Sequence, residues 1–170
     1  MIENKVVNSS IVKRKSFISI GGFDTNPEIL YAEDRAYSIK TALKGFVYDI
    51  EPTSCFQINF YPDSMSTLSA GKWLNAILNL MKKVYNLTGD KYSDAICDQL
   101  FLNAVWAAKY NCWSITKQCL SFAKTIQPGM KPKTSKIFKL GYIFWPFGAF
   151  VIRELLLRFK YKIQSLQIHK

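Results

Sequence analysis

The chain has 170 residues, of which 49% are hydrophobic and 15% aromatic. This composition excludes a globally disordered chain and suits one compact domain with a helical tail. The net charge of +11 is unevenly spread, with −1 over residues 1–63, +4 over 64–126 and +8 over 127–170.

The four cysteines and the single histidine exclude the usual zinc-binding motifs. No two cysteines form a Cys-x-x-Cys pair, and the histidine is His169, next to the last residue. A zinc site needs closely spaced thiol and imidazole ligands. We therefore expect free, mostly buried thiols in a reducing compartment and no metal ligands in this chain.

Residues 1–69 are predicted to combine short strands with one helix. Apolar side chains recur at helical spacing over residues 33–43, and Gly45 lies just beyond the predicted helix end. Residues 46–50 have the pattern of a short strand, and residues 54–60 that of a second one. We expect an α/β unit here and a mainly helical extension after it.

Residues 70–126 are predicted to be helical. Apolar side chains recur every three or four residues over 73–87, again over 93–110 and again over 113–126. Such stripes usually form the contacts between helices. The next segment, residues 127–133, has two prolines and a glycine that end the last of these helices.

Residues 134–170 form a basic, amphipathic tail. Its segment 140–152 has 13 residues without a charge and contains Pro146, whereas a membrane-spanning helix needs about 20 apolar residues. The aromatic run and the basic residues after it are typical of a helix lying in a membrane interface. A tail helix buried against residues 70–126 is the alternative. No element interleaves basic and base-stacking aromatic residues, so no nucleic-acid partner is expected.

Several short motifs follow one another in residues 9–69. In chain order they are Ser9-Ser10, Lys13-Arg14-Lys15, Gly21-Gly22-Phe23-Asp24, Ala32-Glu33-Asp34, Gly45-Phe46 and Pro62-Asp63-Ser64-Met65-Ser66. This order and spacing resemble the second, acceptor-side half of the catalytic domain of family 2 glycosyltransferases of the GT-A type. In that family a strand and a basic residue precede the glycine turn, and an acidic pair then opens a helix.

The resemblance implies roles for the acidic pair. Asp34 would be the general base that takes a proton from an acceptor hydroxyl in an inverting transfer, and Glu33 would orient the acceptor or the base. A helix start favours carboxylates, and a carboxylate that stays ionised can serve as a base. Simple capping of the helix explains the same two residues. If they are functional, both should face a concave surface.

Gly21, Gly22 and Asp24 are the candidate substrate-binding residues. The glycines would form a sharp turn beside the acceptor, because glycine takes positive φ at little cost. Asp24 would fix that turn by an Asx-type hydrogen bond. An ordinary tight turn is compatible with the same residues.

The sequence also departs from the family. It contains no Asp-x-Asp motif, which in the parent enzymes holds Mg²⁺ or Mn²⁺ on the donor diphosphate. Residues 56–61 lack the Arg and His usual at that position, and the Gln-x-x-Arg-Trp motif of processive synthases is absent. We expect no cofactor in this chain, no transfer by the isolated chain, and a parent enzyme that adds single sugars.

The expected function is that of an inverting, non-processive glycosyltransferase part. Through the parent enzyme it would meet a nucleotide-sugar donor and a glycan or lipid-linked acceptor in surface polysaccharide or glycan synthesis. The alternative is a non-catalytic, membrane-associated scaffold derived from such an enzyme. Because no apolar stretch follows the N-terminal charges, we expect a cytoplasmic protein at the inner face of an anionic membrane.

Overall fold

The structure is a computed structural model that describes residues 12–46, 69–134 and 136–168. For residues 136, 137, 161 and 163–168 it describes the helical backbone only. Every regular element in these ranges is a helix and none is a strand, so the predicted α/β fold is wrong. The strands predicted over 46–50 and 54–60 fall almost wholly outside the described residues.

The N-terminal described segment is helical where the family resemblance implied a strand. Helix α1 (Arg14–Ile20) ends at Gly21, whose φ of 87° turns the chain out of the helix. Phe17 and Ile20 are three residues apart, which puts them on one helical face. Ile20 is buried, and the Phe17 ring contacts Tyr37 at 5.3 Å between centroids. Burying this face against α2 therefore favours a helix.

Helix α2 (Glu33–Leu43) follows a 3₁₀ turn over Leu30–Ala32 and matches its predicted range. Its buried residues include Ala36 and Ile39, which join the core of the helices that follow. The described parts of residues 1–69 and 70–126 thus share one hydrophobic core.

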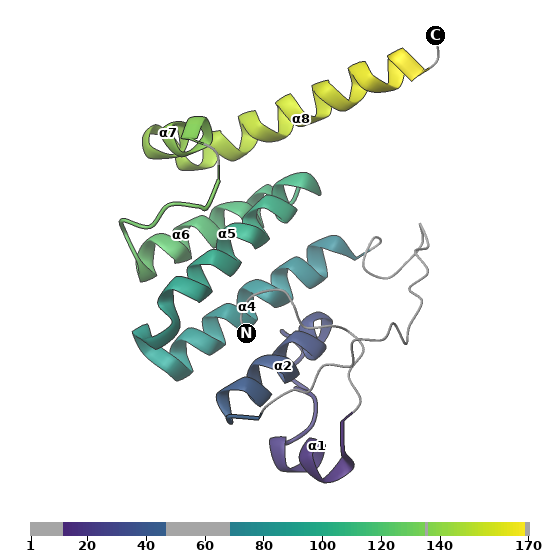
Figure 1. The fold of residues 1–170 in the computed structure, drawn as a ribbon, viewed down its shortest axis with the longest axis vertical. Helices are drawn as coiled ribbons and strands as arrows, with labels where there is room; N and C mark the ends of the chain where they lie inside the picture. Colours follow the sequence, from purple (N-terminus) through teal and green to yellow (C-terminus); the bar gives the residue numbers. More distant parts are fainter. Residues whose placement is uncertain (1–11, 47–68, 135, 169–170) are drawn as a thin grey trace.

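Three helices form the body of the molecule (Figure 1). They are α4 (Ala70–Thr88), α5 (Ser93–Lys109) and α6 (Trp113–Ile126), and they confirm the predicted helical segment. Each contributes residues at intervals of three or four to the core, since this spacing lines one helix face. The largest fully buried side chains of these helices include Leu74, Leu78, Met81, Ile96 and Leu100.

The C-terminal tail forms two helices that pack on the body. They are α7 (Lys136–Phe144) and α8 (Pro146–Ile168), and Pro146 is tolerated because it lies in the first turn of α8. Phe150 is 0% exposed and packs against the ring of Phe138 at 5.1 Å between centroids. Figure 1 shows α8 extending beyond the body toward the C-terminus.

A side chain of α8 also caps another helix. Arg158 donates hydrogen bonds to the Asn111 side-chain oxygen at 2.8 Å and to the carbonyl oxygen of Lys109 at 3.2 Å. A cation at the C-terminal end of α5 interacts favourably with the helix dipole. Within the described residues, no helix is both long enough and apolar enough to cross a membrane.

Two buried cysteines yield a labelling prediction. Burial raises the pKa of Cys97 to about 11 and that of Cys119 to about 12. Because the thiolate is the nucleophile, iodoacetamide at neutral pH should label the half-buried Cys112 before these two, which should react only when the chain unfolds. Peptide mapping by mass spectrometry checks the order. Equal labelling rates in the folded chain would contradict the described core.

Candidate functional site

The acidic pair begins helix α2, as predicted. Glu33 and Asp34 are its first two residues; Glu33 is half-buried and Asp34 exposed. Asp34 Oδ1 accepts a hydrogen bond from the backbone N–H of Arg35 at 2.7 Å. The Asp34 carboxylate is thus accessible to a large substrate and lies at the positive end of the helix dipole.

The glycine turn lies near the other end of α2. Gly21 and Gly22 have φ values of 87° and 59°, and Lys40 Nζ donates to the carbonyl oxygen of Gly22 at 3.1 Å. Lys40 is six residues after Asp34, or about 9 Å along the helix axis. The described contacts therefore place the turn beside the second half of α2, away from the acidic pair.

Asp24 connects the loop after α1 to helix α4. Its Oδ1 accepts the N–H of Asn26 at 3.1 Å, which is the expected Asx-type hydrogen bond, and its Oδ2 forms a 2.5 Å ion pair with Lys83. The Lys83 hydrogen bond, followed by that of Asn26, lowers the Asp24 pKa below its usual value. These contacts account for Asp24 as an anchor of the loop, with no need for a ligand.

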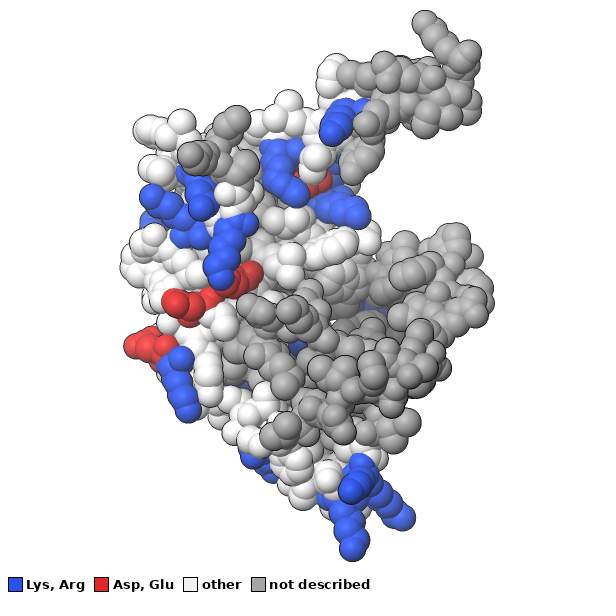
Figure 2. Space-filling model, in the orientation of Figure 1, with Lys and Arg blue, Asp and Glu red and all other residues white. Residues whose placement is uncertain are grey.

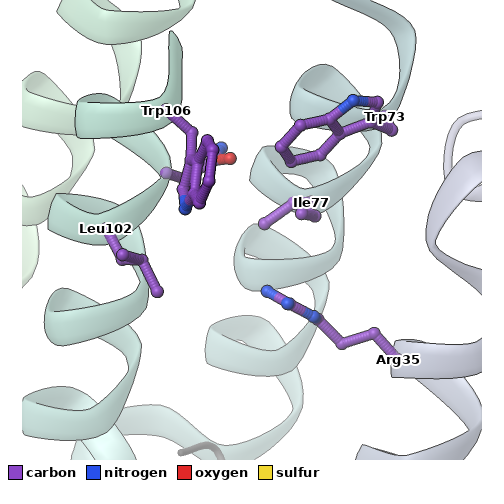
Figure 3. Close-up of a pocket in the computed structure, with 6 residues that line it drawn as sticks. Arg35, Trp73, Ile77, Leu102 and Trp106 are labelled. Carbon is purple, nitrogen blue, oxygen red and sulfur yellow. The ribbon is translucent and has the colours of Figure 1, made fainter. Parts of the chain in front are cut away.

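The structure contains a cavity that the sequence analysis did not identify. It is lined in part by Arg35, the residue that directly follows the acidic pair in the sequence. Its volume is about 200 Å³, and it lies between α4 and α5 with Arg35 of α2 reaching into it (Figure 3). Its lining residues are Arg35, Trp73, Ile77, Leu102, Asn103 and Trp106. Glu33 and Asp34 do not line it, so this cavity does not meet the expectation that both face a concave surface; the side chain that reaches it is that of the next residue, Arg35.

The polar groups of this cavity are Arg35 and Asn103. Arg35 Nη1 donates to the side-chain oxygen of Gln99 at 3.1 Å, and burial lowers the Arg35 pKa while nearby Asp34 raises it. The guanidinium remains charged, because an arginine pKa is far above neutrality. The cavity therefore contains a fixed positive charge next to aromatic walls.

Asn103 has an unused acceptor. Its side chain is 3% exposed, and its Nδ2 donates to the carbonyl oxygen of Leu74 at 2.9 Å, which settles the amide orientation. The Asn103 Oδ1 accepts no hydrogen bond in the described part of the chain. A buried acceptor without a donor costs about 1–3 kcal/mol, and this oxygen is also closed off from solvent.

Four exposed apolar side chains form a second feature, here called the α8 stripe. Ile152, Leu155, Leu156 and Phe159 follow the i, i+3, i+4, i+7 pattern of one helix face, and each is 53–65% exposed. More large apolar side chains are exposed in α7 and just after it, namely Leu140, Ile143, Phe144 and Trp145. Large apolar side chains exposed together on one helix face form the kind of surface patch that often meets a partner or a membrane.

Basic residues flank the α8 stripe. Successive helical residues are about 100° apart, so Lys160 lies on one side of the stripe and Lys162 on the other, and both are exposed. Figure 2 shows basic side chains gathered where the C-terminal helices pack on the body, with few acidic ones among them. The sequence analysis based the expected membrane interface of residues 134–170 on the uncharged run 140–152, but Ala149 and Phe150 in that run are buried.

A metal centre is not seen in the described ranges. No group of three or more His, Cys, Asp or Glu side chains there is placed to hold an ion. Comparisons of the chain with protein-family models, with curated proteins and with solved structures found no match.

Proposed function

We propose that the chain is the acceptor-side part of a family 2 glycosyltransferase that works at an anionic membrane surface on a lipid-linked or glycan acceptor. The transferase part rests on the ordered motifs of residues 9–69 and on Asp34. That carboxylate is exposed at a helix start, where it can meet an acceptor hydroxyl. A nucleotide-sugar donor and its Mg²⁺ or Mn²⁺ would be bound by the other half of the parent enzyme.

The α8 stripe is the observation that carries the membrane part of the proposal. Its apolar side chains lie between Lys160 and Lys162, an arrangement that suits a helix at the depth of lipid headgroups. Each basic residue near an anionic surface contributes about 1 kcal/mol. The net charge of +8 over residues 127–170 attracts an anionic lipid surface, whereas it would repel the same basic tail of a second copy of the chain.

The test replaces Leu155 and Leu156 by Glu and measures co-sedimentation with vesicles of phosphatidylglycerol and phosphatidylcholine. Burial of one leucine contributes up to about 1.5–3 kcal/mol, or roughly tenfold or more in binding. We expect the double variant to bind at least about 100-fold more weakly. Its stability should change little, because both side chains are exposed.

Leu87→Glu is the matched control. Leu87 is 70% exposed at the end of α4, outside the C-terminal helices, so vesicle binding by this variant should equal that of the original chain. The original chain and both variants should bind weakly to pure phosphatidylcholine vesicles, since these vesicles lack anionic charge. Unchanged binding by the Leu155/Leu156 variant would refute the membrane part of the proposal.

A further inference from the structure

We propose that the Trp145 indole is a preformed membrane anchor, held over Gly148 at the start of α8 so that it meets the headgroup region of an anionic bilayer. The inference rests on the membrane part of the proposed function and adds an aromatic anchor to the α8 stripe. It does not depend on the glycosyltransferase part.

Gly148 is the seat of the Trp145 ring. Gly148 is buried, and a Cβ atom at that position would overlap Cδ2 and Cε3 of the indole. The ring therefore occupies the space that any other residue at position 148 would fill with its own side chain. The Trp145 backbone is held from both sides, because its N–H donates to the carbonyl oxygen of Gly141 at 2.9 Å and its carbonyl oxygen accepts the N–H of Ala149 at 2.9 Å. The indole is thus positioned before any lipid arrives.

The seat lies on the same side of α8 as the stripe. Gly148 precedes Ile152 by four residues and Leu155 by seven, so the three positions share one helix face. The Trp145 ring covers that face over the first turn of α8, and the stripe continues it along the helix. The opposite face includes the buried Phe150, which packs into the core. Trp145 therefore forms the N-terminal end of one apolar surface.

The Trp145 ring is seated but remains open to its surroundings. Trp145 is 60% exposed, and Phe144 beside it is 82% exposed. Tryptophan combines a large apolar ring with one N–H donor, which makes it a preferred residue at the boundary between lipid and water. An indole that is already held in place loses less conformational freedom on entering lipid than a mobile side chain does. The seat on Gly148 therefore increases membrane affinity at a small entropic cost.

The charge around the ring decides which occupant it suits. The net charge of residues 127–170 is +8, and their single acid, Glu154, is buried. Lys139 is exposed in α7, and Lys117 Nζ lies 4.8 Å from the centroid of the Phe147 ring in the first turn of α8. Apolar side chains with basic ones around them match anionic lipid, whose headgroups carry the negative charge. A second copy of the chain would bring the same positive charge and be repelled.

The test first compares alanine at two glycines, with co-sedimentation on vesicles of phosphatidylglycerol and phosphatidylcholine as the measurement. Gly148→Ala should push the indole off its seat and weaken binding about three- to tenfold. Gly141→Ala in α7 is the matched control, because its Cβ would lie at an ordinary 3.7 Å from the Ala149 Cβ, and it should bind like the original chain. Both changes introduce a better helix former, so circular dichroism should show both variants folded.

Two variants of Trp145 test the ring itself. Trp145→Ala should bind the same vesicles about tenfold more weakly. Trp145→Tyr keeps an aromatic ring with a polar tip and should stay within about threefold of the original chain. Phosphatidylcholine brominated in the upper part of its acyl chains quenches indoles that reach that depth. At saturating lipid it should quench the original chain more than Trp145→Tyr, which retains the other three of the four tryptophans.

Several results would overturn the inference. It is wrong if Gly148→Ala binds like Gly141→Ala, or if Trp145→Ala binds like the original chain. It is also wrong if brominated lipid quenches the original chain and Trp145→Tyr equally. If the chain self-associates without lipid and Trp145→Ala abolishes that association, the ring meets a second copy of the chain and the membrane anchor is rejected.

The outcome is separable from that of the proposed function. If replacing Leu155 and Leu156 by Glu abolishes vesicle binding while Trp145→Ala and Gly148→Ala bind normally, the membrane proposal is kept and the anchor is rejected. If the leucine variant binds normally while Trp145→Ala does not, the anchor is kept and the α8 stripe is rejected. Failure of the original chain to bind anionic vesicles rejects both.

Discussion

Replacing Asp34 by Asn is expected to lower sugar transfer by the parent enzyme about 10²–10⁴-fold. The amide has nearly the shape of the carboxylate but cannot take a proton from the acceptor hydroxyl. Its oxygen can still accept the backbone N–H of Arg35, so helix α2 should begin as before. The variant therefore removes the base and retains the fold.

The measurement is made in the cells that produce the chain, where any other half of the enzyme is supplied. Surface polysaccharide and labelled lipid-linked glycan are quantified for Asp34→Asn and for Glu28→Gln. Glu28 is an exposed acid six residues earlier and serves as the matched control. If Asp34→Asn cells make glycan at the normal rate, Asp34 is not the base. The non-catalytic scaffold would then become the better interpretation.

Phe150→Ala is expected to destabilise the chain by about 3–5 kcal/mol, because a large buried aromatic is lost and a cavity is left behind. Phe150 is fully buried where α8 packs on the body, and its ring meets those of Phe138 and Tyr142 edge to face. This loss should also weaken the hold of the C-terminal helices on α5 and α6. Urea unfolding followed by circular dichroism measures the change.

Phe159→Ala separates the two faces of α8. Phe159 is the same residue type on the same helix but is 65% exposed in the α8 stripe. Its removal should change stability by no more than about 0.5 kcal/mol, and it should weaken vesicle binding. If both phenylalanines cost the same stability, the described packing of α8 is incorrect.

Helices α2, α4, α5 and α6 could be predicted from the sequence because their signals are local. Apolar residues spaced three or four apart specify which helix face is buried. Gly45 lies just after the end of α2, and the segment 127–133 just after the end of α6. The start of α2 at the acidic pair was predicted for the same reason. The prediction of a strand before Gly21 was wrong. The segment is a helix because Phe17 and Ile20 bury one helical face against neighbours that are distant in the sequence.

The sequence by itself determined the helical body, the basic tail and the acidic pair at the start of α2. Only the tertiary structure decided which helix faces remain exposed and where a cavity forms. Arg35, Trp73 and Asn103 meet in one cavity because α2, α4 and α5 pack together, and no local pattern encodes that packing. Likewise, the leucines of α8 have the spacing of core residues. The buried Phe150 and the capping Arg158 show that another face of α8 contacts the body, which leaves the leucines of the α8 stripe exposed. A helix has two faces, and the partner elements determine which one is left for a ligand or a membrane.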